Sequence, residues 1–257
     1  MNADSMQRFK CWLKQHPDPK MQKLFIGLKR LRASSLPTPK LVNQVIYASY
    51  TFGRDSLSTL QRLFVATPAF KGRCQQCGDA LYLYGGLPYI SGPLNITVGD
   101  ECRISGMTTF NGRSTLVNTT RPELLIGNNV GIGWQVTISV ATQVVIEDNV
   151  RIAAGCQLFG YSGHPIDARD RAAGMPDEEN RVGSIVLQHD VWLGSGVRVL
   201  PGVTVGAGTI VAAGSIVTHD LPPYCLAAGA PVKVIRSLET LGLDANRRDA
   251  NTRGAYA

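Results

Sequence analysis

Aliphatic residues recur every six positions along much of this chain. From Leu187 the sequence reads LQHDVW, LGSGVR, VLPGVT, VGAGTI, VAAGSI and VTHDLP, and the first position of each unit is Leu or Val. The fifth position is small or apolar in the same units. The pattern also appears upstream, as VGDECR, ISGMTT, IGNNVG, IGWQVT, IEDNVR and IAAGCQ. An α-helix repeats at 3.6 residues and a simple strand at two, so neither explains a period of six.

A period of six fits one short strand followed by one corner. Three such units close a coil of about 18 residues, and stacked coils bury a continuous column of aliphatic side chains. Gly, Asn and Asp recur at the third and fourth positions, where corners can require a positive φ. The pattern therefore predicts an all-β solenoid. A membrane span over residues 197–217 is the alternative, and Arg198, Pro201 and the glycines argue against it.

The repeat stops after Leu158. The next inward position falls on His164, in the stretch FGYSGHPID, and the next clear unit begins only at Leu187. Residues 165–186 contain two prolines and many charges, which is typical of a loop that leaves the coil. A long excursion from a regular solenoid is usually functional.

The repeats resemble the hexapeptide-repeat acyltransferase family, whose fold is a left-handed parallel β-helix. The resemblance covers residues 92–236 and is closest to the galactoside, maltose and xenobiotic O-acetyltransferase branch. It is carried by GHPID, by VWLGSGVRVLPGVTVGAGTIVAAGSIVTHDLPP and by AAGAPVKVIR. The stretch LYLYGGLPYISG is similar to the segment that precedes the repeats in polysaccharide acetyltransferases.

The resemblance implies that His164 is the general base. A thioester is already activated, so the reaction needs a group that takes the proton of the attacking hydroxyl, and imidazole suits this near neutral pH. The alternative is that His164 caps a corner or lies on the surface. The resemblance also implies a homotrimer that binds acetyl-coenzyme A between subunits. The donor contacts that it implies are Trp192, Ser195, Ala213, Thr218, Lys233 and Arg236. At the position of Lys233 the family often has Arg, and Lys lacks the two-pronged geometry of Arg.

No metal is expected at the site. His164, His189 and His219 could form a triad only if they converged, and they occupy different positions of their units. The pair Cys74 and Cys77, in CQQCG, has zinc-knuckle spacing but lacks a second pair, so a zinc site and a turn with buried thiols both stay open.

The positive charge is concentrated at the start of the chain. Residues 1–40 carry nine Lys or Arg and two Asp, and their net charge of +7 equals the net charge of the whole protein. Apolar residues at helical spacing predict a helix around residues 21–31, a second from Leu41 to about Tyr50 and a third capped by Ser56. The third helix would carry an apolar stripe at Leu57, Leu60, Leu63 and Phe64. Such an arm could pack on the β-helix and cap its open edge, and residues 8–40 could also touch an anionic membrane.

We divide the chain into a basic, mainly helical extension (1–91), the β-helix (92–236) and a polar tail (237–257). The chain shows no secretion signal, no apolar run of membrane-spanning length and no nucleic-acid module, so we expect a cytoplasmic protein, with peripheral contact to the inner face of the membrane as an addition. The predicted function is O-acetylation of a sugar, in the biosynthesis of a surface polysaccharide. Two alternatives stay open: N-acetylation of a nucleotide-linked amino sugar, and a non-catalytic scaffold.

Overall fold

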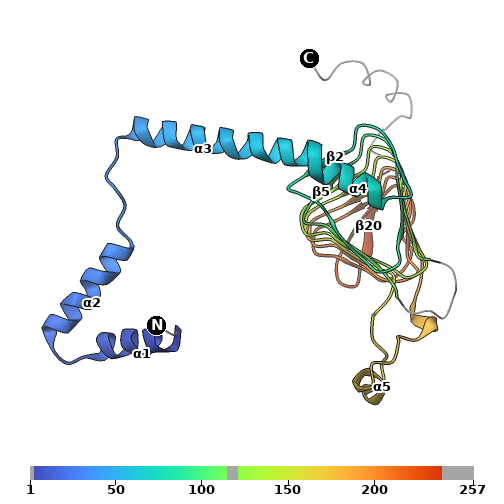
Figure 1. The fold of residues 1–257 in the computed structure, drawn as a ribbon. Helices are drawn as coiled ribbons and strands as arrows, with labels where there is room; N and C mark the ends of the chain where they lie inside the picture. The colour runs from blue at the N-terminus through green and yellow to red at the C-terminus, as the bar shows by residue number, and fades with distance from the viewer. Residues whose placement is uncertain (1–2, 115–120, 239–257) are drawn as a thin grey trace. The chain divides into compact units, whose positions relative to one another are not determined.

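Three parallel sheets form the sides of a coil in the computed structural model of the protein, which describes residues 3–114 and 121–238 (Figure 1). Successive strands pass from sheet A to sheet B to sheet C and then back to sheet A, one coil further on. Sheet A contains β1 (Gln76–Cys77), β4 (Asn95–Val98), β7 (Glu123–Ile126), β10 (Gln143–Ile146), β13 (Ile185–Leu187) and β16 (Thr204–Val205).

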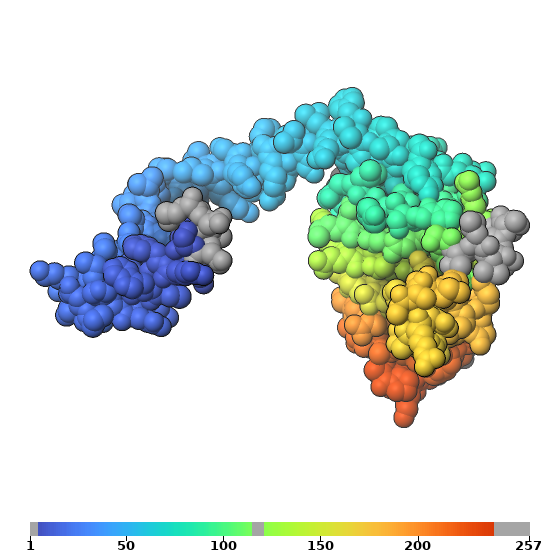
Figure 2. Space-filling view, turned by 60° about the horizontal axis from the view of Figure 1, so that its bottom comes forward, coloured from blue at the N-terminus to red at the C-terminus, as the bar shows by residue number. Residues whose placement is uncertain are grey.

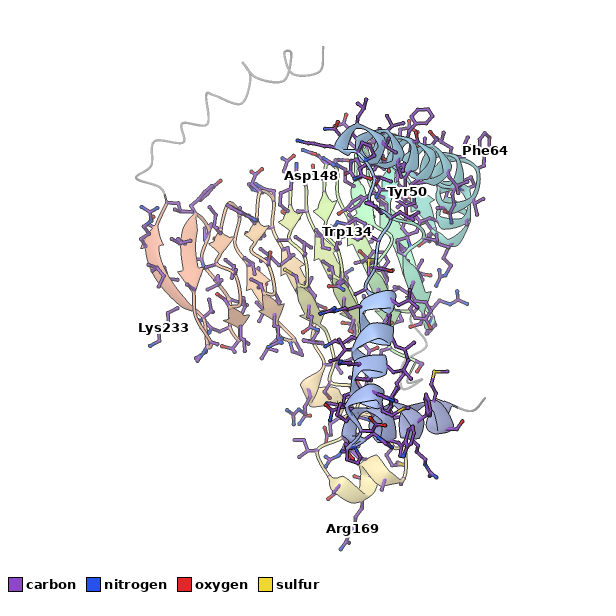
Figure 3. The ribbon with its side chains drawn as sticks, turned by 90° about the vertical axis from the view of Figure 1, so that its left-hand side faces the viewer. Tyr50, Phe64, Trp134, Asp148, Arg169 and Lys233 are labelled. Carbon is purple, nitrogen blue, oxygen red and sulfur yellow. The ribbon has the colours of Figure 1, made fainter. Side chains whose placement is uncertain are left out.

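Sheets B and C complete the coil. Sheet B contains β2 (Tyr82–Tyr84), β5 (Arg103–Ser105), β8 (Gly131–Ile132), β11 (Arg151–Ile152), β14 (Trp192–Leu193), β17 (Ile210–Val211), β19 (Cys225–Ala228) and β20 (Lys233–Ser237). Sheet C contains β3 (Tyr89–Ser91), β6 (Thr109–Gly112), β9 (Thr137–Val140), β12 (Gln157–Phe159), β15 (Arg198–Val199) and β18 (Ile216–Val217). The last strand, β20, runs antiparallel to β19 and carries Lys233, at the C-terminal end of the stack in Figure 3.

The first position of each six-residue unit points into the coil, as predicted. In the six units that begin at Leu187 these side chains are fully buried: Leu187, Leu193, Val199, Val205, Val211 and Val217. Burying one Val or Leu side chain contributes on the order of 2 kcal/mol, so the aliphatic column is a main source of stability.

The fourth position of each unit forms the corner. Its φ is positive at Asn129, Gln135, Asn149, Gly155, Asp190, Gly196, Gly202, Gly208 and Gly214. Gly, Asn and Asp tolerate this conformation better than other residues, which explains their recurrence there.

The coil begins before residue 92, where the sequence pattern places its start. Strands β1, β2 and β3 pair in parallel with β4, β5 and β6, so residues 76–91 form a first coil. The sequence does not predict this first coil, because residues 76–91 do not follow the six-residue pattern. Most of the predicted tail, residues 239–257, lies outside the described residues.

Two compact units divide the chain, residues 1–54 and 55–257, and their boundary falls within a long helix. The first unit contains α1 (Ala3–Gln15), α2 (Pro19–Arg32) and most of α3 (Lys40–Gln61). Asp18 caps α2 by accepting a hydrogen bond from the backbone N–H of Lys20, 2.8 Å away. No residue of α2 or α3 is buried. Within the described residues, no helix is both long enough and apolar enough to cross a membrane.

The predicted second and third helices are one helix. Ser56 lies inside α3 and does not begin a new helix, so that prediction is wrong. The π-helix η1 (Arg62–Ala66) and α4 (Thr67–Arg73) follow α3, and Ala66 and Phe70 join the core at the first coil. Ala66 and Phe70 therefore cover the edge of the first coil. The predicted apolar stripe does not, because all four of its side chains are exposed: Leu57, Leu60, Leu63 and Phe64.

Candidate active site

The predicted loop leaves the coil between β12 and β13. Residues 160–184 leave the corner between sheets C and A, and they include the short helices α5 (Ala168–Ala172) and η2 (Glu179–Arg181). Asp167 caps α5 by accepting hydrogen bonds from the backbone N–H groups of Arg169 and Asp170, at 2.7 and 3.1 Å. The loop, yellow in Figure 2, stands out from the surface of the stacked coils.

His164 lies in the first turn of this loop and is exposed. The repeat placed it at an inward position, but the chain has already left the coil, so its ring does not enter the core. Gly163, directly before it, has a φ of +80°, a conformation that glycine adopts without strain. The His164 carbonyl accepts a hydrogen bond from Ser162 Oγ at 3.0 Å. This placement leaves the imidazole accessible to a substrate.

A buried ion pair connects the loop to the coil. Arg113, which follows β6, donates from Nε to Asp177 Oδ1 at 2.9 Å, and its Nη2 lies 2.8 Å from the same oxygen. Arg113 Nη1 also donates to Glu179 at 2.9 Å. Arg113 and Asp177 are only 8% and 5% exposed. Burial alone would lower the pKa of Arg113, but the hydrogen bonds and charges of Asp177 and Glu179 outweigh it and raise that pKa.

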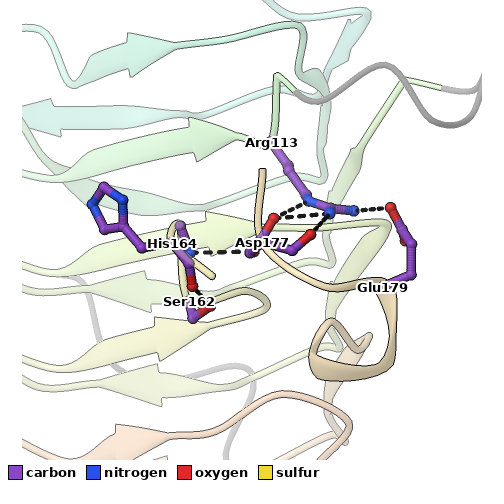
Figure 4. Close-up of polar contacts among 6 residues, drawn as sticks. Arg113, Ser162, His164, Asp177 and Glu179 are labelled. Carbon is purple, nitrogen blue, oxygen red and sulfur yellow. Dashed lines mark hydrogen bonds and ion pairs between the residues drawn. The ribbon is translucent and has the colours of Figure 1, made fainter. Parts of the chain in front are cut away.

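The same carboxylate reaches the histidine turn. Asp177 Oδ2 accepts a hydrogen bond from the backbone N–H of Gly163 at 3.2 Å, and Glu178 Oε1 accepts one from Ile166 at 3.0 Å. Figure 4 shows the chain of contacts from Arg113 through Asp177 to the backbone beside His164. The turn that carries His164 is therefore held on both sides by loop carboxylates, one of them anchored to the coil.

Three of the implied donor contacts lie on sheet B or at the corner that follows it. Trp192 lies on sheet B and is 52% exposed, and Ser195 and Ala213 occupy the corners that lead from sheet B to sheet C in successive coils. The backbone N–H of Gly214 donates to the Ser195 carbonyl at 2.9 Å, so these two corners stack directly.

The other implied contacts lie elsewhere on the coil. Thr218 follows β18 at the corner between sheets C and A, and its hydroxyl contacts His219 Nδ1 at 3.1 Å. Lys233 and Arg236 are exposed on β20. The structure thus places His164 and Thr218 at one corner of the coil, and Trp192 on the side opposite that corner. One chain does not bring the imidazole and Trp192 together.

The described residues offer no group of three or more His, Cys, Asp and Glu side chains that could hold a metal ion. Cys74 and Cys77 pack against the core, and burial raises the pKa of the Cys74 thiol to about 12. Both cysteines are partly buried.

Sequence reasoning missed the Arg113–Asp177 pair. The two residues are 64 positions apart and neither belongs to a recognisable motif. The only signal is the density of carboxylates in the loop, Asp177, Glu178 and Glu179, which a solvated surface would explain equally well.

Comparison with known proteins supports the predicted family. Residues 184–219 match the family described as bacterial transferase hexapeptide (six repeats). The galactoside O-acetyltransferase of Escherichia coli (strain K12) is 41% identical over 113 residues, which are 44% of this chain and 53% of that protein. The chain spans about half the length of the curated relatives it matches.

Similarity extends to solved structures. The N-acyltransferase AntD from Bacillus cereus, in complex with dTDP and 3-hydroxybutyryl-CoA, shares the fold with a TM-score of 0.52 at 15% identity, over 68% of this chain and 89% of that one. A galactoside acetyltransferase in complex with coenzyme A has a TM-score of 0.42 at 26% identity, over 72% and 73% of the two chains. The matched family and the parallel coils confirm the predicted resemblance: the chain contains the hexapeptide repeats of bacterial transferases.

Proposed function

We propose that this protein is an acetyl-coenzyme A-dependent O-acetyltransferase that acts on a sugar hydroxyl, in the biosynthesis of a surface polysaccharide. The observation that carries the proposal is the exposed His164, on a turn held by the anchored carboxylate of Asp177. The similarity to a galactoside O-acetyltransferase supports both the reaction class and a sugar acceptor.

In the proposed mechanism the acceptor hydroxyl attacks the thioester carbonyl directly. The His164 imidazole takes the hydroxyl proton as the new C–O bond forms. The C–S bond then breaks, and the imidazolium returns the proton to the departing thiolate. A backbone N–H at the corners of Ser195 or Ala213 would stabilise the developing oxyanion without a special side chain.

The donor is proposed to lie along the stacked corners. Trp192 would wall the pocket near the thioester, with the pantetheine arm along Ser195 and Ala213 of one copy and, because Thr218 lies at a different corner, along Thr218 of a neighbouring copy. Lys233 and Arg236 would meet the nucleotide phosphates at the exposed end of the coil. The surface exposure of all six side chains is compatible with these contacts.

A homotrimer of left-handed coils would complete the site. The support is the separation of His164 from Trp192 on different sides of one coil, so that a second copy would have to supply one of them. A closed threefold arrangement gives three equal sites of this kind.

The basic arm is proposed to touch an anionic membrane on its cytoplasmic face through residues 8–40. Its net charge and the absence of buried residues in α2 support this contact. Flotation with vesicles that contain anionic lipid tests it, and no flotation would remove the proposal.

A thiol-release assay with acetyl-coenzyme A tests the central proposal. Release that depends on a glycan hydroxyl supports O-acetylation, whereas release only with amino sugars on a nucleotide carrier would support N-acetylation. No binding and no turnover of acetyl-coenzyme A would favour a non-catalytic scaffold.

A further inference from the structure

An open groove runs along the outer face of sheet B. Its volume is about 1010 Å³, and its lining includes Tyr82, Tyr84, Arg103, Gly131, Arg151 and Trp192. These residues come from five successive strands of the sheet, β2, β5, β8, β11 and β14. We call this surface the sheet B groove. Trp192, at one end, is the residue proposed to lie near the thioester.

Five outward positions of the groove stand in register. Tyr82 is opposite Arg103, Arg103 opposite Gly131, Gly131 opposite Arg151, and Arg151 opposite Trp192. Neighbouring strands lie about 4.8 Å apart, so the Cα atoms of the two arginines are separated by about 10 Å. Gly131 lies between them and contributes no side chain, and the Arg151 side chain passes over it: a Cβ at Gly131 would lie 3.2 Å from Arg151 Cδ.

The groove has an excess of positive charge. The Arg103 guanidinium lies 5.8 Å from the centre of the Tyr82 ring, and Arg151 Nη2 donates to Asn129 Oδ1 at 3.0 Å. Neither arginine forms an ion pair with any carboxylate of the residues that the structure describes. Among the lining residues the carboxylate is Glu101, so two guanidinium groups stand against one negative charge.

Aromatic rings flank these charges. Tyr82 and Trp192 are 42% and 52% exposed at the two ends of the register. Tyr84 is fixed by donating from its hydroxyl to the Ile132 carbonyl at 2.8 Å and by an edge contact with Trp134, with ring centres 5.1 Å apart. The C–H face of a pyranose is apolar and packs on such rings, while its substituents remain free to hydrogen-bond.

We propose that the sheet B groove binds the acceptor, and that the acceptor is an anionic glycan, a deduction that rests on the function proposed above. A sugar ring packs on the exposed Trp192, because guanidinium groups already lie over the Tyr82 ring and Tyr84 is held against Trp134. Its carboxylate or phosphate pairs with Arg103 and Arg151. Guanidinium groups bind both anions through paired hydrogen bonds. The groove leads to Trp192, so an acceptor bound in it extends toward the proposed thioester position.

Binding to the full-length chain without coenzyme A tests this assignment. The probes are trigalacturonate, which carries carboxylates, UDP-glucose, which carries phosphates, and maltotriose, which is neutral. We expect at least one anionic probe to bind about tenfold or more tightly than maltotriose, and Arg103→Gln or Arg151→Gln to remove most of that preference. Arg198→Gln is the matched control, because Arg198 lies on sheet C, where its Nε donates to Gln157 Oε1 at 2.9 Å. We expect this substitution to leave the preference for the anionic probe intact.

The outcome also separates this inference from the proposed function. Equal affinity for charged and neutral probes, no binding of any probe, or a preference that survives in both groove variants would overturn the groove assignment. Thiol release, measured on the same preparation, reports the transferase activity independently. Charge-selective binding without any thiol release would support the groove assignment and contradict the transferase activity. Thiol release with neutral sugars and no charge selectivity would support the transferase activity and contradict the groove assignment. A preference for UDP-glucose alone identifies phosphate as the recognised anion, and a preference for trigalacturonate alone identifies carboxylate.

Discussion

Asp177 joins the guanidinium of Arg113, at 2.8 Å, to the backbone beside His164. One carboxylate thus connects the rigid coil to the turn that carries the proposed base. A side chain on a loop gains precision when its supporting residues are themselves fixed by buried hydrogen bonds. The Arg113–Asp177 pair is therefore expected to position His164 through the backbone of Gly163 and not by contact with the imidazole.

Asp177→Asn tests this positioning role. The amide has one acceptor oxygen in place of two, so it can serve either Gly163 or Arg113 but not both, and it loses the charge that holds Arg113. We expect turnover to fall roughly 10-fold or more, since small displacements of a catalytic group are costly. The KM for acetyl-coenzyme A is expected to stay unchanged. Glu179→Gln is the control, because that carboxylate is 46% exposed and does not contact the histidine turn. Steady-state kinetics of both variants separate the two cases, and an equal loss in each would contradict the assignment.

Arg113→Ala is expected to destabilise the whole chain. It leaves the Asp177 carboxylate buried without its partner, which typically costs about 3–5 kcal/mol of the free energy of unfolding. Urea unfolding of the wild type, Arg113→Ala and the double variant Arg113→Ala/Asp177→Ala measures this. The double variant is expected to recover part of the loss, because it removes the unpaired charge as well.

His164→Ala is expected to reduce turnover by roughly 10²–10⁴-fold. The side chain is exposed, so the free energy of unfolding and the affinity for the donor are expected to change little. Thiol release and equilibrium binding of coenzyme A check these two effects. Unchanged turnover would reject His164 as the base.

Replacing Lys233 and Arg236 by Ala is expected to weaken coenzyme A binding and to leave turnover at saturating donor nearly unchanged. The effect is expected to be larger at low salt, because exposed charges are screened as ionic strength rises. Titrations of coenzyme A at two salt concentrations measure it. An unaltered affinity at low salt would show that the nucleotide phosphates bind elsewhere.

Stability is expected to fall as the pH rises above about 9. Burial raises the pKa of Cys74 from 9.0 to about 12, and burial also raises those of Cys102 and Cys156. The unfolded thiols ionise first, so the stabilisation that is present below pH 9 is lost progressively up to about pH 12. Urea midpoints between about pH 8 and pH 11 measure this decline, and Cys74→Ala is expected to make it shallower.

The sequence predicted the coil well where one rule governs every unit. Leu193, Val199 and Val211 are buried because each sits at the first position of a six-residue unit, and Asn149 or Gly196 turns the corner because few other residues adopt that conformation. The first coil was missed, since residues such as Gln76 and Tyr89 join the sheets through pairing with later strands and not through the repeat.

The prediction was weaker at the site. The loop was recognised because it interrupts the repeat. The repeat counts His164 as the next inward position, whereas the structure places it on the exposed loop, because the chain departs from the coil several residues earlier. Its role as the base stays a prediction. The partners Arg113 and Asp177 meet only after two distant segments fold, so local sequence could not pair them. The sheet B groove was not foreseen either, because Gly131 looks like any other residue between corners.

Parallel pairing of the strands also fixes the step by which the surface of sheet B can lengthen. Each strand from β2 to β14 in sheet B bonds only to its parallel counterparts one coil before and one coil after, so the surface between Tyr82 and Trp192 can lengthen only by whole coils, in increments of about 4.8 Å. A related chain that gains one coil there would acquire a longer track without any change in the chemistry at its ends. Under the proposed assignment of the groove, a longer surface of this kind would accommodate a longer acceptor without any change in the residues proposed to carry out the transfer.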